Sequence, residues 1–409
     1  MIPTLYLEGR MTLTCERLLE FDLFEFHEKD MNFETFSRFY SVLSEIEKID
    51  YFIRKTPSFP GSTDKIVRDE LISVIGATLS IEGTILDKEE ILESIDKADK
   101  GEPLKRRGQE AANSKDVYDF LRNTRIDEYT ESLIRQIHTL FTKEMNYTSN
   151  IPGQYRLAFN VTFGEPRRQC LCPTLSEIEC AMAGFIKWLN KIGTGPISSS
   201  PFVKAIMAHY YLSEIHPFGD GNGRTARALE AAILYKHGVN RYCFWSLANF
   251  WAMHKDIYIN HLGDIRRTQN PFEFVIWGLN GYKDEITTIQ GRVLTKHKQL
   301  MLRDYVQFLF RTKDEQKIKI NQRMVELMRI ITARARISIK KLWLDPEAIL
   351  LYKDVSRQTK TRDLVKLLDL ELLKPEKTEQ GLILKPNYEL LEELEYYVRL
   401  DPDEISRTT

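Results

Sequence analysis

A twelve-residue stretch, His216 to Arg227 with the sequence HPFGDGNGRTAR, constrains the fold of this chain more than any other segment. Before it, residues 201–215 follow an amphipathic helical pattern, with Ser200 as a cap and a proline in the first turn. After it, residues 224–236 are rich in Ala and Leu. The pattern predicts two packed helices joined by a glycine-rich loop whose side chains are held in fixed positions.

The composition of this loop favours anion binding. Glycines allow main-chain N–H groups to converge on an anion, and a helix N-terminus beside them adds a favourable field for phosphate. Arg224 and Arg227 stand three residues apart, so on a helix they project from one face. Asp220 offers a hard oxygen ligand for Mg²⁺, and His216 can take a proton near neutral pH. Together these residues predict a nucleotide triphosphate site with its own base.

The overall composition excludes several classes of protein. The 409 residues are 43% hydrophobic and 29% charged, which is typical of a soluble globular protein with two or three domains. No run approaches the ~18 apolar residues of a membrane span, and the first residues lack the apolar core of a signal peptide. The formal charge of −1 gives no overall attraction to nucleic acid or to an acidic membrane. Five irregularly spaced cysteines indicate reduced thiols in a cytoplasmic protein.

The spacing of apolar residues predicts a mainly α fold. Apolar residues recur every three or four positions in residues 33–54, 64–81, 87–98, 109–124, 126–143, 176–192 and 247–262. Residues 156–171 differ, because apolar and polar residues alternate there around a Gly-Glu-Pro turn. That alternation predicts a β-hairpin.

The stretch 216–227 matches every fixed position of the HPFx[D/E]GNGRxxR signature, so the chain resembles Fic-domain proteins. The resemblance implies a helical Fic core that transfers AMP from ATP to a Ser, Thr or Tyr hydroxyl of a protein. In that reaction His216 deprotonates the hydroxyl and Asp220 holds Mg²⁺, while Arg224 and Arg227 steady the β- and γ-phosphates. The nucleotide-binding residues implied are Gly221, Asn222, Gly223, Arg224, Thr225, Ala226, Arg227 and Tyr258.

The resemblance also implies a role for the hairpin of residues 156–171. Fic proteins carry a two-stranded flap beside the active site, which aligns the target segment by strand pairing. Residues 135–138 and 153–156 resemble the segments that lead into this part of the family's fold. We therefore expect residues 156–171 to form the flap.

Upstream of the loop, the segment TLSIEG matches the (S/T)xxxE(G/N) inhibitory motif of Fic proteins at Thr78, Glu82 and Gly83. It closes the expected helix of residues 64–83, ahead of the catalytic core. A carboxylate near Arg227 can form a bidentate, charge-assisted pair with its guanidinium, which then cannot bind the γ-phosphate. We therefore expect Glu82 to restrain the enzyme.

Residues 246–262 resemble the helix that lies beside the adenine in the family. An Asn-Arg pair often precedes a Tyr there, whereas this chain has His254 and Lys255 before Tyr258. The departure leaves the contacts with the base open. His209, seven residues before His216, is assigned to packing.

The last third of the chain resembles a winged helix-turn-helix. Three helices are expected at residues 321–335, 338–342 and 356–370, followed by a wing at 370–386. Four basic residues of the third helix can meet phosphates in a major groove, and three nearby Asp residues offset them. DNA binding and a protein-docking or dimer-supporting role stay open. The basic residues are Arg357, Lys360, Arg362 and Lys366.

These observations predict four parts: an N-terminal helical region (1–62), a Fic domain (63–285), a helical connector (286–315) and a winged helix-turn-helix (316–400). The expected protein is a Mg²⁺-dependent adenylyltransferase that uses ATP, modifies itself or another protein and, by resemblance, forms a homodimer away from membranes. Two alternatives remain. With Glu82 orienting a water, the same site can remove AMP. A nucleotide-sensing, DNA-binding regulator is disfavoured, because a pure sensor has no need of His216 and Asp220.

Overall fold

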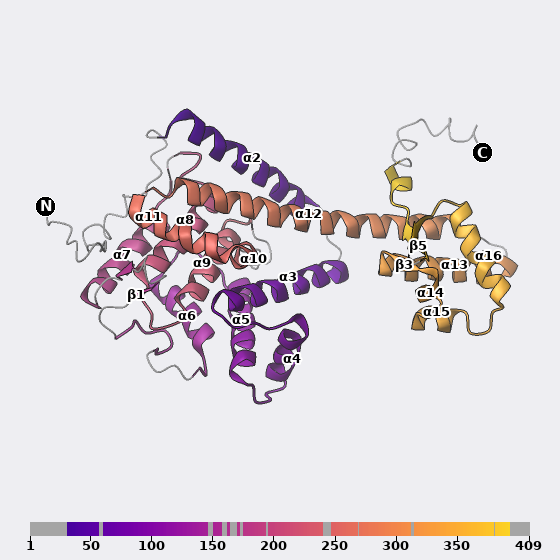
Figure 1. Cartoon of the computed structure of the whole chain (residues 1–409), viewed down its shortest axis with the longest axis horizontal. Coiled ribbons are helices and arrows are strands. Elements are labelled where there is room, and N and C mark those ends of the chain that lie inside the picture. Colours follow the sequence, from indigo (N-terminus) through magenta and orange to yellow (C-terminus); the bar gives the residue numbers. More distant parts are fainter. Residues whose placement is uncertain are drawn as a thin grey trace. The chain divides into compact units, whose positions relative to one another are not determined.

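The computed structural model shows a mainly helical chain, as the sequence predicted (Figure 1). It divides into two compact units, residues 1–290 and 291–409. Among the described residues, no helix has both the length and the apolar character needed to cross a membrane. The structure describes residues 31–56, 60–145, 150–157, 162–163, 170–171, 175–193, 195–239, 247–268, 270–311, 315–379 and 381–392.

The first unit is built from helices and one short strand pair. Its last helix, α12, continues into the second unit and therefore crosses the boundary expected at residue 285. The expected helix 247–262 is interrupted at His254, which ends α10 before α11 begins. The helices are α2 (Phe33–Lys55), α3 (Pro60–Ile81), α4 (Lys88–Asp99), α5 (Arg106–Asn123), α6 (Glu131–Thr142), α7 (Leu175–Asn190), α8 (Pro201–Ile215), α9 (Asn222–Lys236), α10 (Ala248–Met253), α11 (Lys255–Thr268) and α12 (Phe272–Leu309).

Helices α8 and α9 form the centre of the first unit and pack closely against each other (Figure 1). Every residue of α8 from Val203 to Ile215 except Lys204 is buried, as is nearly all of α9. Helix α6 packs on α9, and α3 packs on α10. The loop between α8 and α9 therefore leaves one buried helix and enters another, which restricts its freedom.

The expected hairpin is present as a short antiparallel pair, β1 (Thr162–Phe163) and β2 (Cys170–Leu171). The rest of the expected flap, apart from residues 156 and 157, lies outside the described residues. Arg156 does not continue β1, because its main-chain N–H donates to the carbonyl of Pro217 at 2.9 Å. The expectation of five reduced cysteines is wrong, since Cys180 is disulfide-bonded.

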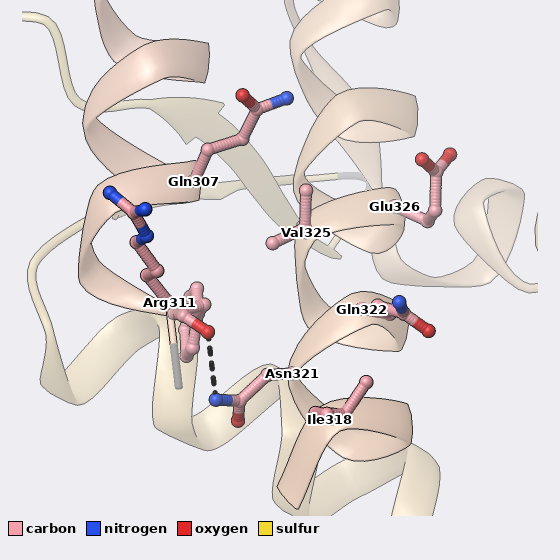
Figure 2. Close-up of a pocket in the computed structure, with 8 residues that line it drawn as sticks. Gln307, Arg311, Ile318, Asn321, Gln322, Val325 and Glu326 are labelled. Atoms are coloured by element: carbon pink, nitrogen blue, oxygen red, sulfur yellow. Dashed lines mark hydrogen bonds between the residues drawn. The ribbon is translucent and has the colours of Figure 1, made fainter. Parts of the chain in front are cut away.

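The second unit has helices at the three places expected, residues 321–335, 338–342 and 356–370, and also a strand, β3, and a helix, α15, that were not expected. Its sheet is antiparallel in the order β3-β5-β4, and β4 and β5 form the expected hairpin. A pocket lies beside α12 and α13, where the Asn321 side-chain amide donates to the Phe310 carbonyl at 2.9 Å (Figure 2). The elements are α13 (Glu315–Arg334), β3 (Ile337–Ser338), α14 (Ile339–Leu342), α15 (Pro346–Leu351), α16 (Arg357–Asp369), β4 (Leu373–Thr378) and β5 (Gly381–Pro386).

Candidate active site

The loop from α8 to α9 turns by means of two left-handed residues. His216 has a φ of 48° and ends α8, while its N–H donates to the Leu212 carbonyl at 3.0 Å. Gly221 has a φ of 78° and precedes the first residue of α9. A Cβ at Gly221 would also lie 3.2 Å from the Thr142 side chain. Glycine is therefore required at Gly221 both for conformation and for space.

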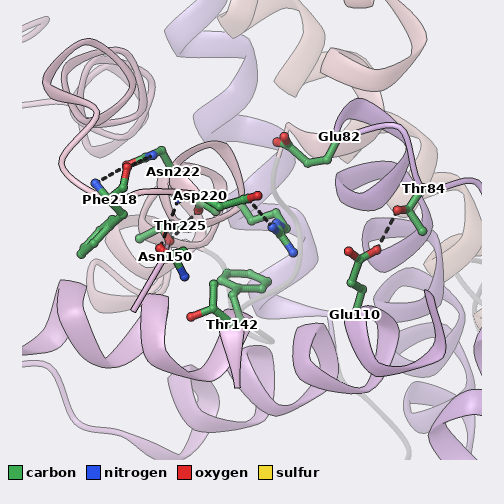
Figure 3. Close-up of polar contacts among 12 residues, drawn as sticks. Glu82, Thr84, Glu110, Thr142, Asn150, Phe218, Asp220, Asn222 and Thr225 are labelled. Atoms are coloured by element: carbon green, nitrogen blue, oxygen red, sulfur yellow. Dashed lines mark hydrogen bonds and ion pairs between the residues drawn. The ribbon is translucent and has the colours of Figure 1, made fainter. Parts of the chain in front are cut away.

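The interior of the loop is fixed by Asn222. Its side-chain oxygen accepts from the Phe218 N–H at 2.9 Å, and its amide donates to the Phe218 carbonyl at 2.9 Å (Figure 3). The Asn222 side chain thus holds the loop together, and only its main-chain N–H at the first turn of α9 remains to face an anion. The predicted nucleotide contact of Asn222 is consequently a main-chain contact.

His138 of α6 bonds to the loop and supports it. Its Nδ1 accepts from the Gly153 N–H at 2.9 Å, so Nε2 carries the proton and donates to the Asp220 carbonyl at 2.8 Å. The imidazole also stacks on Phe218 with ring centroids 3.8 Å apart. Burial lowers the pKa of His138 to about 4, so the ring is neutral at pH 7. From the sequence, His138 was expected only as part of a family-like segment, with no role of its own.

Arg156 holds the start of the loop. Its Nε donates to the His216 carbonyl at 2.9 Å, and its main chain bonds to Pro217. The side chain is 3% exposed, so these bonds are shielded from water. Residues 153–156 resemble a segment of the family, but the sequence did not show this contact, because it joins positions 60 residues apart.

The His216 imidazole is suited to act as a base. Its Nδ1 donates to the Ser213 carbonyl at 3.4 Å, which places the lone pair of the neutral ring on Nε2. Burial lowers the pKa of His216 to about 4, so the ring is neutral throughout the physiological range. A neutral imidazole held at a helix end can accept a proton from a neighbouring hydroxyl.

Asp220 and Arg224 form an ion pair at the first turn of α9. Arg224 donates to the Asp220 carboxylate at 2.8 Å, and the Asp220 N–H donates to the Asn150 side chain at 3.1 Å (Figure 3). The Asp220 side chain is 41% exposed, whereas that of Arg224 is 4% exposed. Within the described ranges, no three His, Cys, Asp or Glu side chains gather into a metal site. A single accessible carboxylate still fits Mg²⁺, which takes its remaining ligands from phosphates and water.

Arg227 is buried and bound by the end of α3. Its Nε donates to the Thr78 hydroxyl at 2.8 Å, and a terminal nitrogen donates to the Thr78 carbonyl at 3.1 Å and to the Glu82 carboxylate at 2.6 Å. Burial acts to raise the pKa of Glu82, but the charge and hydrogen bond of Arg227 outweigh it, so the pKa is lowered. The Glu82–Arg227 contact is therefore a charged pair.

The end of α3 aims Glu82 at the first turn of α9 (Figure 3). Gly83 has a φ of 91°, and the N–H of Thr84 donates back to the Leu79 carbonyl at 3.0 Å, so the chain reverses just after Glu82. A Cβ at Gly223 would lie 2.5 Å from a Glu82 carboxylate oxygen. The carboxylate therefore rests directly against the turn that is expected to bind phosphate.

Two hydrogen bonds with residues of other helices hold the end of α3 in place. The Lys255 ammonium donates to the Ile81 carbonyl at 2.7 Å, and the Thr84 hydroxyl donates to the Glu110 carboxylate at 2.7 Å (Figure 3). Lys255 occupies one of the two places where the sequence departs from the Asn-Arg pair of the family. In this structure its amine supports the end of α3.

Three of the expected nucleotide-binding side chains point into the protein. The Thr225 hydroxyl donates to the Gly221 carbonyl at 2.8 Å, and Ala226 is fully buried. Tyr258 is 6% exposed, and its hydroxyl lies 2.9 Å from His209 Nε2. The structure thus brings together His216, Asp220, Arg224 and Arg227, but it does not present the side chains of Thr225, Ala226 and Tyr258 to a ligand.

Comparison with known proteins agrees with this geometry. Residues 128–234 match the family model described as Fic/DOC family. The chain is 36% identical over 87 residues to protein adenylyltransferase fic-1 of Caenorhabditis briggsae, and 44% identical over 66 residues to protein adenylyltransferase Fic of Nematostella vectensis. These stretches are 21% and 16% of this chain, and they span only 16% and 15% of the relatives' lengths.

The fold resembles solved Fic structures over a longer range. A Fic family protein from Desulfovibrio desulfuricans G20 aligns with a TM-score of 0.54 at 19% identity, over 86% of this chain and 96% of that one. Fic-1 from C. elegans aligns with a TM-score of 0.50 at 19% identity, over 64% of this chain and 73% of that one. The family match therefore shows a Fic domain at residues 128–234, and the solved structures show that the fold around it is similar.

Proposed function

We propose that this chain is a protein adenylyltransferase, which transfers AMP from ATP to a Ser, Thr or Tyr hydroxyl of a protein and releases pyrophosphate. The observation that supports this most is the neutral His216 imidazole, held beside the N-terminus of α9 with Arg224 and Arg227 on the same helix. A base next to a phosphate-binding turn is what nucleotidyl transfer to a hydroxyl requires. The names of the sequence relatives agree with the proposal.

In the proposed reaction, His216 Nε2 takes the proton of the target hydroxyl as its oxygen attacks the α-phosphorus. The bond between the α-phosphorus and the bridging oxygen breaks, and pyrophosphate leaves. Main-chain N–H groups at Gly221, Asn222 and Gly223 stabilise charge on the α-phosphate, since the first N–H groups of a helix lack partners within it. Asp220 would hold Mg²⁺, which would supply positive charge beside the phosphates. Arg224 steadies the β-phosphate.

Arg227 is proposed to hold the γ-phosphate once Glu82 has left it. In the structure the Glu82 carboxylate pairs with Arg227 and lies against Gly223, so the ATP phosphates and this carboxylate compete for the same binding position. Two anionic groups cannot share that position, because like charges repel each other strongly at such short range. Glu82, with Thr78 and Gly83 shaping its approach, therefore restrains transfer.

The proposal is tested by intact-mass spectrometry after incubation with ATP and Mg²⁺. The native chain, Glu82→Gly and Glu82→Gly/His216→Ala are compared, alone and with candidate target proteins. A mass gain of one AMP per site in Glu82→Gly, absent with His216→Ala, supports transfer. Loss of AMP from a modified hydroxyl by the native chain, with no gain in any variant, would instead establish the removal reaction.

For residues 316–400 we propose a winged helix-turn-helix that binds duplex DNA. Residues 316–392 have sixteen Lys and Arg against eleven Asp and Glu, although the whole chain has a formal charge of −1. Asp363, which the sequence counted against DNA binding, is 2% exposed and pairs with Arg323 at 2.6 Å. The negative charge of Asp363 therefore does not lie on the outward face of α16, beside its exposed basic and polar side chains. Its exposed residues include Arg357, Gln358, Thr361, Arg362 and Lys366.

Gel shifts with random duplex at several salt concentrations test this second proposal. Binding through phosphates weakens steeply as salt rises, and Arg357→Ala/Arg362→Ala should weaken it further. No shift at low salt would leave protein docking as the role of this unit. Light scattering of the same samples would show whether the chain forms the predicted homodimer.

A further inference from the structure

A buried polar cluster joins α8, α9, α10 and α11 behind the candidate active site. At its centre is the Glu230 carboxylate, which is fully buried. One oxygen accepts from the Leu247 N–H at 2.7 Å, and the other accepts from His209 Nδ1 at 2.8 Å and from Trp251 Nε1 at 3.3 Å. A buried carboxylate is tolerated only when it is so well paired, so these donors are arranged for it.

The hydrogen bonds of the cluster continue from Glu230 through His209 to Tyr258. Because a carboxylate can only accept, His209 carries a proton on Nδ1, and its Nε2 accepts from the Tyr258 hydroxyl at 2.9 Å. Burial raises the pKa of Tyr258 above its ordinary value, so the hydroxyl keeps the proton that it donates. The ring of Tyr258 also packs on Trp251, with centroids 5.3 Å apart.

The cluster residues lie on the same two helices as the groups proposed to act on the nucleotide. On α9, Glu230 lies three residues after Arg227, and on α8, His209 lies seven residues before His216. Seven residues are about two helical turns, or ~10.5 Å along the axis. The bond between His209 and Glu230 therefore fixes how far α8 can slide along α9. A slide of α8 would move the imidazole relative to the phosphate-binding turn.

We propose that Glu230, His209 and Tyr258 position the His216 imidazole against the phosphate-binding turn, and that Tyr258 is a positioning residue rather than a contact for adenine. The inference rests on the proposed function, because it assigns roles to residues in that reaction. It differs from the expectation drawn from the family resemblance, which placed Tyr258 against the nucleotide. Its basis is the engagement of the Tyr258 hydroxyl by His209 within the core.

Tyr258→Phe and Tyr282→Phe form a matched pair of variants for the test. Both hydroxyls are buried, but Tyr282 makes no hydrogen bond with the described residues. Each change is made in the full chain carrying Glu82→Gly, and kcat and the KM for ATP are measured. We expect Tyr258→Phe to lower kcat roughly tenfold with KM within about twofold, since small misplacements of reacting groups cost up to ~100-fold. Tyr282→Phe should keep the parent values.

A second readout does not depend on activity. The ring ¹⁵N shifts of His216 are recorded in selectively labelled protein, which contains only eight histidines. We expect Tyr258→Phe to move the His216 signals and Tyr282→Phe to leave them in place. Glu230→Gln, which keeps the side-chain volume, is expected to give the same loss of kcat and is the second variant should Tyr258→Phe fail to fold.

The outcomes separate the inference from the proposed function. A raised KM with unchanged kcat in Tyr258→Phe would make Tyr258 a nucleotide contact and overturn the inference. Identical rates and His216 shifts in the two Phe variants would overturn it as well. If the Glu82→Gly parent transfers no AMP, the proposed function fails, while the His216 shifts still decide whether Tyr258 positions the imidazole.

Discussion

Replacing Glu82 by glycine removes the carboxylate that pairs with Arg227, so this change tests the proposed restraint most directly. The carboxylate lies 2.6 Å from a guanidinium nitrogen, and Arg227 itself is 1% exposed. Glycine also clears the space beside Gly223, which the carboxylate oxygen fills. Thr78 still accepts two hydrogen bonds from Arg227, so the variant should remain folded.

The size of the effect follows from the contact that ATP must displace. A hydrogen bond to a charged group contributes about 1.5–3 kcal/mol. At about 1.4 kcal/mol for each factor of ten, this range corresponds to roughly a 10- to 100-fold gain in transfer. The Glu82 side chain is 37% exposed, and solvent screening therefore favours the lower part of that range.

The assay measures incorporation of labelled AMP by the native chain, Glu82→Gly and Glu82→Gln. Glutamine keeps the shape but loses the charge, so its rate should fall between the other two. Calorimetry on the same proteins should show tighter ATP binding in the order native, glutamine, glycine. Equal transfer rates for the native chain and Glu82→Gly, with an active His216-dependent site in both, would refute this reasoning.

Three further changes probe the site and the second unit. His216→Ala should reduce AMP transfer by ~10²–10⁴ while calorimetric ATP binding persists, and normal turnover would exclude His216 as the base. Burial lowers the pKa of His138 from 6.5 to about 4, so the unfolded chain binds more protons between these values, and the free energy of unfolding should drop as the pH falls through that window. His138 contributes at most about 3 kcal/mol to this loss, and denaturant melts of His138→Gln should show a smaller loss, because His216 has a pKa lowered in the same way and still contributes. Asp363→Ala should destabilise the second unit by about 3–5 kcal/mol, because Arg323 loses its buried partner, and an unchanged melt would contradict the pairing.

The sequence predicted the helix pair around the loop well, because the signals there are local. Helix α8 covers residues 201–215 as expected, since a proline begins it and His216 ends it in a left-handed turn. Helix α9 begins at Asn222, within the Gly-Asn-Gly that was expected to open it, because Gly221 takes a left-handed conformation just before it. Both helices were therefore predictable from short-range chemistry in the sequence.

The supports of the loop could not be predicted, because they join distant positions. His138 bonds to Asp220 across 82 residues, and Arg156 bonds to His216 across 60. Both lie in the family-like segments 135–138 and 153–156, but nothing in the local pattern shows which distant positions they contact. Glu230 is a similar case, since a glutamate in an Ala-rich helix is typically solvent-facing, yet here it is fully buried. Packing between helices decided its place.

The buried position of Arg227 explains why one group can serve both inhibition and binding. A guanidinium that is 1% exposed is costly without an anionic partner, because its charge cannot be solvated. In the structure Glu82 provides that partner, and in the proposed active state the γ-phosphate does. The exchange replaces one anion by another, so the energetic difference between the two states is much smaller than the cost of an unpaired Arg227. A modest change at the end of α3, where Lys255 bonds to the Ile81 carbonyl, can therefore shift the balance between restraint and transfer.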